Sequence, residues 1–416
     1  MSKSHAIFLR PVTSLYFGRP GALPAGEAHS GTSWFPPPIS AFQGMIRTKL
    51  LEFARVFSPP QKVQALVGTS DTLPDEWSII GPFPACERGR RSLQLWFPIP
   101  AFLFPPNNAN KQEPVLAQPL TAPKDPHLLF DNGARCADGQ SYLTVCGNPI
   151  MAKPKPLTGW ISSNNLKWAL YLGRDGSQID WNPRECAKGL PPFVKWEIKP
   201  GLKREKTLEN GFQITGRAQE GMLYFLKCLR FSPDSGIAGW LDAPLSEPLS
   251  PAALEQGPIV AGKKGGVMAF EKMERMDPLW EELRRGAHLE GCRISRSQRV
   301  WIVLLSPGRW KSVTELESML SIDSKVQVTV ESIISSAPMF LGGFSMANRK
   351  PRPAVPWYPP GTSILVKLRA ENEDDIKNFL KEMNNRTVLA SKQHLPFGYG
   401  HVLLARPMED GGNNEQ

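Results

Sequence analysis

The strongest constraint on the fold is the succession of hydrophobic patterns in the C-terminal third of the 416-residue chain. An apolar run at 301–305, ended by Ser-Pro-Gly, predicts a buried strand. The segment Ser312–Glu315 has the residue types of a helical capping box, and apolar residues follow it at helical spacing as far as Leu320. Apolar and polar residues then alternate over 326–330, which predicts a half-buried strand.

The remainder of this region predicts three further elements. An apolar run at 364–368 predicts a strand, and the acidic residues within 371–375 favour a helix start because carboxylates interact well with the positive end of a helix. The apolar face of that helix comprises Ile376, Phe379, Leu380 and Met383. A last strand covers 402–404. The order βαββαβ within about 110 residues is typical of a ferredoxin-like unit.

The N-terminal part follows a stretched version of the same order. A first strand at 6–9 precedes a helix whose start we assign to a capping box of Ser40 and Gln43. The apolar face of this helix comprises Phe42, Met45, Ile46, Leu50 and Phe53. We expect strands at 222–226 and 237–241 to pair with each other, followed by a short helix from 250 and a closing strand at 267–270.

These patterns predict an α+β chain of two tandem ferredoxin-like (RRM-like) domains. The first domain covers 1–275 and carries a long irregular insertion at about 57–220, rich in Pro, Gly, Trp and basic residues. The second domain covers 276–416 and carries a glycine-rich loop at 398–400.

Charge and cysteine content restrict the partners and the compartment. A net charge of +10 and a pI near 9.3 favour a polyanionic partner such as nucleic acid, although a basic protein without such a partner stays an alternative. The six cysteines form no C-x-x-C pair, so we expect reduced thiols and no structural zinc. Since no apolar run approaches about 18 residues, we expect no membrane segment and a cytoplasmic location.

Two glycine loops precede the closing strands of the two predicted units, GKKGG at 262–266 and GYGH at 398–401. Neither has the spacing of a dinucleotide fingerprint or a Walker loop. Two alternatives stay open for them, a tight turn and a contact with an RNA backbone, for which glycine gives close approach, lysine gives charge and tyrosine a stacking surface. The RNA-binding candidates are Gly262, Lys263, Lys264, Gly265, Gly398, Tyr399, Gly400 and His401.

Several short segments, in order along the chain, resemble those of RAMP proteins from CRISPR effector complexes, and most closely subunit three of the Cmr (type III-B) complex. The segments are 34–51 (WFPPPISAFQGMIRTKLL), 80–83 with 97–100, 220–224, 341–344 with 350–351, 359–362 and the last glycine loop. The resemblance implies a non-catalytic subunit without a cofactor. It also implies that the chain holds the 5′ repeat-derived tag of the CRISPR RNA, docks on the large polymerase-like subunit and meets other RAMP subunits.

Two residues are assigned through this resemblance. Arg47, on the helix after the proline segment, is a candidate phosphate contact or a solvated helix-face arginine. His29 lies between the first strand and first helix, where some RAMP relatives that cleave RNA without metal have a histidine. An endonuclease that uses His29 to process CRISPR RNA is therefore the alternative function, and a free-standing binder of single-stranded RNA is a third. No cluster of carboxylates predicts a metal site.

Overall fold

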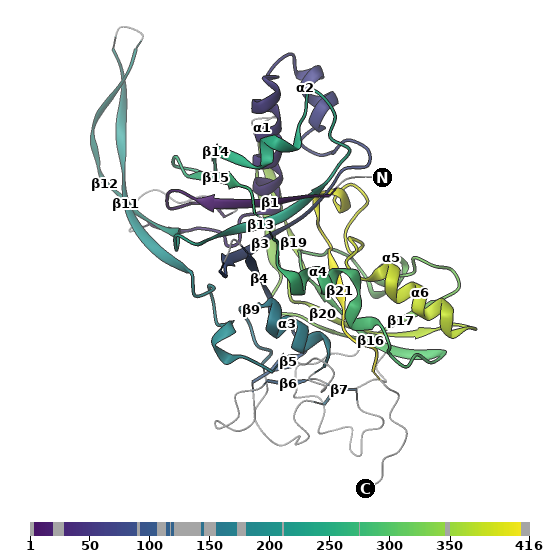
Figure 1. The fold of residues 1–416 in the computed structure, drawn as a ribbon. Coiled ribbons are helices and arrows are strands. Elements are labelled where there is room, and N and C mark those ends of the chain that lie inside the picture. Colours follow the sequence, from purple (N-terminus) through teal and green to yellow (C-terminus); the bar gives the residue numbers. More distant parts are fainter. Residues whose placement is uncertain are drawn as a thin grey trace.

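The structure is a computed structural model that describes residues 4–19, 29–89, 92–105, 114–116, 118–119, 143–144, 155–172, 180–209, 212–273, 275–345 and 350–408. Over these ranges the chain is an α+β protein with several mostly antiparallel sheets, which confirms the predicted class (Figure 1). None of the described helices has the length and apolarity needed to cross a lipid bilayer. Parts of the expected insertion lie outside the described residues, so its extent stays a prediction.

The largest sheet contains eight strands in the order β10-β9-β4-β3-β13-β1-β15-β14. The first strand, β1 (Ser4–Pro11), pairs antiparallel with β13 (Ser235–Asp242) on one side and with β15 (Val267–Glu271) on the other. At the edge, β14 (Gln256–Val260) follows the short 3-10 helix η4 (Pro251–Leu254). The predicted first strand, short helix and closing strand are thus confirmed.

The helix α1 (Ile39–Ala54) lies against this sheet. Its buried side chains include Phe42, Met45, Ile46 and Leu50, as the helical spacing predicts. Two details of the prediction are wrong. No side chain caps the helix, which begins directly after Pro38, so Ser40 is already inside it and forms no capping box. Phe53 is 52% exposed because the last turns of α1 project beyond the sheet (Figure 1).

The strand that pairs with β13 is β3 (Ser78–Glu87), and not 222–226 as predicted from the sequence. In the observed register Ile237 lies opposite Pro84 and Leu241 opposite Ile79. The same sheet is extended by three more strands from the segment that we expected to be an irregular insertion: β4 (Leu93–Pro98), β9 (Trp160–Ser162) and β10 (Cys186–Ala187). The prediction failed because it paired neighbouring apolar runs, whereas β13 pairs with a strand far earlier in the chain.

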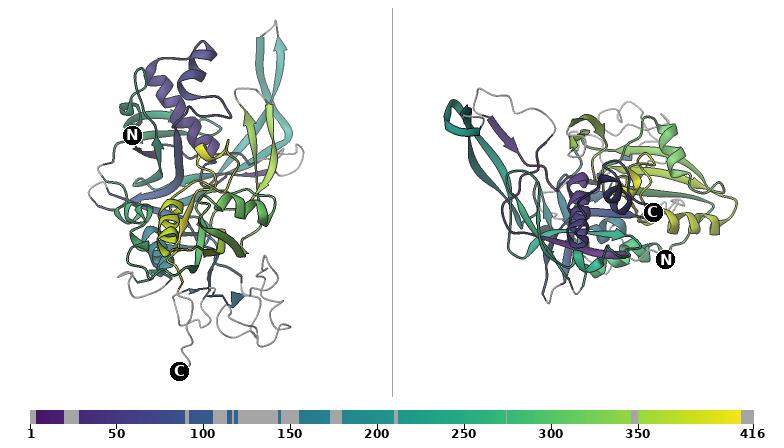
Figure 2. Two further views of the ribbon diagram at one scale, coloured as in Figure 1. Left: turned by 90° about the vertical axis from the view of Figure 1, so that its right-hand side faces the viewer. Right: turned by 90° about the horizontal axis from the view of Figure 1, so that it is seen from above.

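Residues 222–226 belong instead to a long hairpin. Its strands β11 (Val194–Glu209) and β12 (Phe212–Phe231) project together from the body of the protein (Figures 1 and 2). The short strand β2 (His29–Thr32) pairs in parallel with the stem of β12.

The C-terminal part matches the predicted elements closely. They are β16 (Ser297–Leu304), α5 (Val313–Leu320), β17 (Gln327–Ile334), β20 (Ser363–Arg369), α6 (Glu373–Met383) and β21 (Val402–Leu404). The four strands form a sheet in the order β17-β20-β16-β21. The hydroxyl of Ser312 accepts a hydrogen bond from the amide of Glu315 at 3.1 Å, so the predicted cap of α5 is confirmed. Buried residues of both helices and the sheet form one core.

The remaining elements connect and cover these sheets. They are α2 (Pro60–Val67), α3 (Ser163–Leu170), α4 (Pro278–Arg285), η3 (Pro183–Glu185), η5 (Ala287–Leu289), η6 (Leu395–Phe397), β5 (Leu103–Phe104), β6 (Val115–Leu116), β7 (Gln118–Pro119), β8 (Leu143–Thr144), β18 (Met339–Ser345) and β19 (Lys350–Trp357).

A separate apolar cluster joins the large sheet to the C-terminal part of the chain. Phe8 and Phe83 of the large sheet lie in the same buried cluster as Trp280, Trp301 and Leu403 of the C-terminal part. The ring centroids of Phe83 and Trp280 are 5.5 Å apart. Because the side chains of this cluster are almost completely buried, the two parts share a core and pack as one body.

Candidate nucleic-acid interface

The two lysines of the first glycine loop lie on an exposed turn between β14 and β15. Lys263 and Lys264 are both exposed, and the turn closes through a 2.8 Å hydrogen bond from the amide of Ala261 to the carbonyl of Gly266. Gly262 has φ +69°, and a Cβ atom there would lie 2.5 Å from the carbonyl oxygen of Tyr16. Glycine is therefore required for the turn to approach the backbone at Tyr16. A close approach of this kind is what the glycines of the loop predicted.

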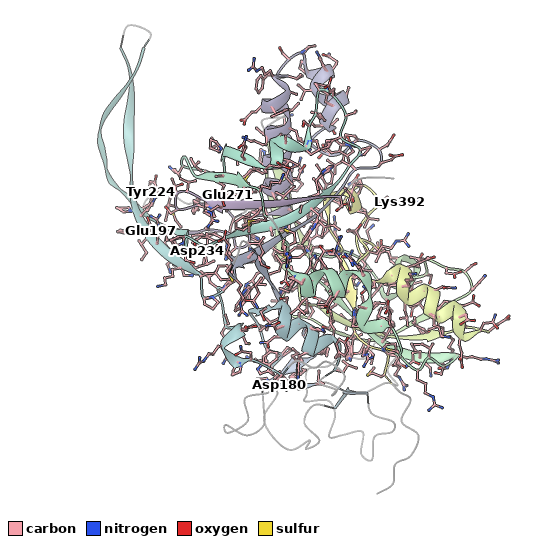
Figure 3. All side chains as sticks on the ribbon, viewed as in Figure 1. Asp180, Glu197, Tyr224, Asp234, Glu271 and Lys392 are labelled. Carbon is pink, nitrogen blue, oxygen red and sulfur yellow. The ribbon has the colours of Figure 1, made fainter. Side chains whose placement is uncertain are left out.

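The second lysine contacts an aromatic residue of the hairpin. The Lys264 Nζ donates a hydrogen bond to the Tyr224 hydroxyl at 2.9 Å and lies 5.3 Å from the centre of its ring. The ring of Tyr224 covers Gly201 of the opposite strand, where a Cβ atom would lie 2.3 Å from the ring. This contact joins the lysine turn to the stem of the hairpin, where Figure 3 labels Tyr224 and Glu197.

The face of the hairpin that carries Tyr224 is rich in cations along β11, whereas on β12 it also carries Leu226 and Cys228, which are buried in a cluster with Tyr16. Opposite residues of an antiparallel pair point to the same side, and the register pairs Lys195 with Arg230, Lys199 with Leu226 and Gly201 with Tyr224. Glu197 lies on the same face and forms ion pairs with Arg230 at 2.5 Å and with Lys199 at 3.5 Å. We call Lys195, Lys199, Tyr224, Arg230 and Lys264 the basic face of the hairpin.

A second group of cations and aromatic rings lies on the other side of the lysine turn. The side chain of Lys263 lies over Gly18, where a Cβ atom would be 3.2 Å from its Nζ. The next residue, Arg19, places its guanidinium 5.4 Å from the ring centre of Trp34. Cations beside flat aromatic surfaces are the residue types that bind the phosphates and bases of single-stranded RNA.

Arg47 has protein partners in this structure. Its guanidinium donates hydrogen bonds to Gln43 at 2.8 Å and to the backbone carbonyls of Gly68 and Thr69 at 3.2 and 2.7 Å. Burial lowers the pKa of Arg47, and Asp71 partly opposes that shift. These contacts tie α1 to the end of α2, so Arg47 is not a solvated helix-face arginine. Its role as a phosphate contact stays a prediction.

The second glycine loop packs against protein backbone. Gly398 has φ +90°, and a Cβ atom there would lie 2.3 Å from the carbonyl oxygen of Ile79 in β3. At Gly400, with φ +66°, a Cβ atom would lie 2.4 to 2.7 Å from the backbone of Leu389. In both positions glycine permits a close approach, and the neighbour is the main chain of this protein. The tight-turn alternative therefore describes this loop.

His401 is enclosed with it, and Tyr399 is half-buried. The ring of Tyr399 packs against Trp357 at 4.8 Å, and burial raises its pKa to about 12. His401 has no exposed surface and lies between Phe83 and Trp280, and burial lowers its pKa to about 3. Because a fully buried ring cannot stack on a base, we leave His401 out of the interface, together with Gly398 and Gly400, which face protein backbone. Tyr399 is half-buried, and its contact with RNA stays a prediction.

Most residues of the basic face were not predicted from the sequence. The signal was present in VKWEIK at 194–199, where charged and apolar residues alternate with the period of a strand that has two different faces. The segment lay inside the expected irregular insertion, and this alternation was not used. The contact between Lys264 and Tyr224 joins residues 40 positions apart and has no local signal.

The residue of the alternative catalytic function lies near this surface. In the parallel pairing of β2 with β12, His29 lies opposite Tyr224. Within the ranges that the structure describes, no group of three or more His, Cys, Asp and Glu side chains is placed to hold a metal ion.

Comparison with known proteins gives one family. Residues 7–407 match the model of the family described as CRISPR-associated protein (Cas_Cmr3). No curated protein matches the chain. One similar solved chain comes from "Cryo-EM structure of the Type III-B Cmr-beta bound to cognate target RNA and AMPPnP, state 1", with 14% identity, a TM-score of 0.42, and coverage of 91% of this chain and 88% of that one. Another comes from "Cryo-EM structure of the Type III-B Cmr-beta bound to cognate target RNA", with 14% identity, a TM-score of 0.42, and coverage of 95% and 96%.

Proposed function

The chain belongs to the Cas_Cmr3 family of CRISPR-associated proteins, and from this premise we propose that it is a non-catalytic, RNA-binding subunit of a type III-B (Cmr) effector complex. In this role it holds the 5′ repeat-derived tag of the CRISPR RNA. It docks on the large polymerase-like subunit and contacts other RAMP subunits.

The observation that carries the RNA-binding part is the contact of the lysine turn with the hairpin. Lys264 lies on Tyr224, and Lys195, Lys199 and Arg230 share the face of that tyrosine. Glu197 neutralises only part of this charge. When an RNA backbone binds along this face, lysine and arginine take the place of the counterions condensed on its phosphates. The release of those counterions supplies much of the affinity for nucleic acid.

The surroundings of the histidines support a role without catalysis. A general base must reach the 2′-hydroxyl whose proton it removes. His288 and His401 are 1% and 0% exposed, and burial lowers their pKa to about 4 and about 3. His394 packs against Trp357 and Tyr399. His288 and His401 are therefore unsuitable for acid–base chemistry on RNA, and His29 is the histidine that the family resemblance gives to test.

We also retain the tandem ferredoxin-like organisation as a proposal. Numbered along the chain, the strands of the C-terminal unit are β16, β17, β20 and β21. In the sheet the first strand lies between the third and the fourth, and the second strand lies outside the third. The segment β3-β13-β1-β15 of the large sheet has the same order if β3 is taken as the second strand. The predicted division at 275/276 follows from these two units, although their cores are joined.

The test is binding of labelled CRISPR repeat RNA to the purified chain without added metal. We expect a mobility shift without cleavage. Replacing Lys263 and Lys264 by glutamine should flatten the dependence of log K on log salt by about 1.4, since each phosphate contact on a single strand contributes about 0.7. Cleavage that disappears in His29→Ala would contradict the proposal and support the processing endonuclease.

A matched control is provided by two exposed lysines elsewhere, Lys62 and Lys392. Figure 3 shows Lys392 on the side of the molecule away from Tyr224. Glutamine at these two positions removes the same net charge and should leave the salt dependence unchanged. Equal effects of the two double variants would mean that only net charge matters, and the proposed surface would be wrong. Co-purification in a stoichiometric complex with a large polymerase-like subunit tests the docking role.

A further inference from the structure

A cleft of about 670 Å³ lies at the base of the hairpin, between its two strands and the large sheet. Its walls come from β3 and β4, from η3, and from the segments where β11 begins and β12 ends. This volume is within the range of cavities that hold small organic ligands. The cleft is separate from the lysine turn at 262–265.

The rim of the cleft has an excess of positive charge. Four of its lining residues are cationic, Arg88, Arg184, Lys195 and Arg230, and two are acidic, Glu87 and Glu185. The acidic residues are already engaged, Glu87 with Arg10 and Glu185 with Arg88. Arg230 is likewise paired with Glu197.

Two of the four cations have no such partner. Arg184 and Lys195 are exposed, and neither side chain forms an ion pair within the part of the chain that the structure describes. Two cations that face one cleft without a carboxylate repel each other and attract an anion. The site therefore favours a ligand that brings its own negative charge.

The interior of the cleft is apolar and rigid. Phe193 packs edge-to-face on Trp96 with ring centroids 5.7 Å apart, and Pro192 and Phe231 complete the wall. Below them the carboxylate of Glu185 accepts hydrogen bonds from Ser162 at 2.5 Å, Asn164 at 3.0 Å and Gln94 at 3.2 Å. Because these contacts hold η3 against the sheet, Arg184 on η3 is held at the rim of the cleft.

We propose that this cleft binds one nucleotide, with its base on the wall formed by Pro192 and Phe193 and its phosphate between Arg184 and Lys195. A flat apolar wall beneath two free cations matches a nucleobase joined to a phosphate more closely than it matches an acidic peptide, which has no need of the wall.

The cleft also opens onto the basic face of the hairpin. Lys195 and Arg230 line the cleft and form a register pair, and Lys199 and Tyr224 lie on the same face further along the hairpin. Six residues separate Lys195 from Gly201, the partner of Tyr224, which is roughly 20 Å along a strand. The nucleotide is therefore one residue of a single-stranded RNA whose backbone continues toward Lys264. This inference rests on the proposed RNA-binding function and adds a base-binding site to it.

The direct test is photocrosslinking with the full-length chain. A set of repeat RNAs carries 4-thiouridine at one position each, and adducts are mapped by mass spectrometry after irradiation. We expect adducts from one position, or from two neighbouring positions, on the peptide that contains Pro192 and Phe193. The double variant Arg184→Ala, Lys195→Ala should reduce this adduct about tenfold and flatten the salt dependence by about 1.4.

Two further variants separate stacking from folding and from net charge. Phe193→Leu keeps an apolar side chain at the wall but removes the aromatic ring, and should weaken RNA binding about tenfold if a base stacks there. Lys188 is exposed and close in sequence but does not line the cleft, so Lys188→Ala should behave as the unchanged protein.

The possible outcomes separate the nucleotide site from the RNA-binding function on which it rests. Adducts confined to the lysine turn, or a double variant that binds like Lys188→Ala, would overturn the nucleotide site and leave the RNA-binding function intact. A chain that neither binds nor crosslinks to repeat RNA would overturn both.

Discussion

Two fully enclosed histidines predict a steep loss of stability in mildly acidic solution. His288 donates one hydrogen bond, from its Nε2 to the carbonyl of Leu404 at 2.7 Å, and its Nδ1 has no partner among the described residues. His401 donates a hydrogen bond from its Nε2 to the side-chain oxygen of Asn385 at 2.8 Å, and within the described ranges its Nδ1 likewise has no partner. Burial is the largest cause of the lowered pKa in each case, with values of about 4 for His288 and about 3 for His401.

The sign of the effect follows from the order of the pKa values. Both folded-state values lie below the ordinary value of 6.5, so the unfolded chain takes up protons first as the pH falls. The contribution of the two histidines is complete above pH 6.5 and is lost as the pH falls toward 4 and 3. Between pH 7 and pH 5 each histidine should lower the free energy of unfolding by about 1.8 kcal/mol, or about 4 kcal/mol for both.

Urea unfolding followed by tryptophan fluorescence at half-unit steps from pH 7 to pH 5 measures this loss. Most carboxylates titrate below this window, so they contribute little to the slope. His394, whose pKa is also lowered by burial, adds a change of the same sign. His401→Gln keeps a hydrogen-bond donor near Asn385 but cannot titrate, and it should remove about half of the pH dependence whatever it does to stability at pH 7. A free energy of unfolding that stays constant from pH 7 to pH 5 would refute the reasoning.

Three substitutions test particular contacts. Arg47→Met should lower the free energy of unfolding by about 2 kcal/mol, because two half-buried backbone carbonyls lose their donor, and it should leave RNA affinity unchanged. A specific loss of RNA affinity would instead support the phosphate contact. Gly398→Ala should lower the free energy of unfolding by about 3 kcal/mol, because it adds a clash with the backbone of Ile79 to the strain of a positive φ. Gly291→Ala, with φ +66° and open space around it, should lower it by about 1 kcal/mol. Equal losses for the two variants in thermal or urea unfolding would contradict the packing role of the loop. Ser312→Ala should cost about 1 kcal/mol through loss of the helix cap, measured in the same way.

The accuracy of the sequence-based predictions depended on how local the underlying interactions are. The cap at Ser312 and the apolar faces of α5 and α6 depend on residues a few positions apart, and these elements were predicted correctly. The pairing of β13 with β3 depends on residues 149 to 164 positions apart, and the sequence offered a nearer apolar run that proved to be the hairpin strand β12.

The same distinction holds for the candidate site. The sequence identified Lys263 and Lys264 because charge and glycine stand together there, but it could not show that Lys264 reaches Tyr224. It also grouped the two glycine loops by their similar position before a strand. In the folded chain the lysine turn is exposed, whereas Gly398 lies against the backbone of Ile79.

The amino-acid sequence by itself determined the α+β class, the elements of the C-terminal part, the family resemblance and the excess of positive charge. These properties follow from residue types and from hydrophobic periodicities of two and 3.6 residues, which indicate which side of a strand or helix is buried. Only the tertiary structure decided what each buried side packs against, and therefore which strands pair, which glycines face protein backbone and which cations share a surface. Periodicity carries no information about partners, because a strand or helix of given pattern can bury its apolar side against any complementary neighbour.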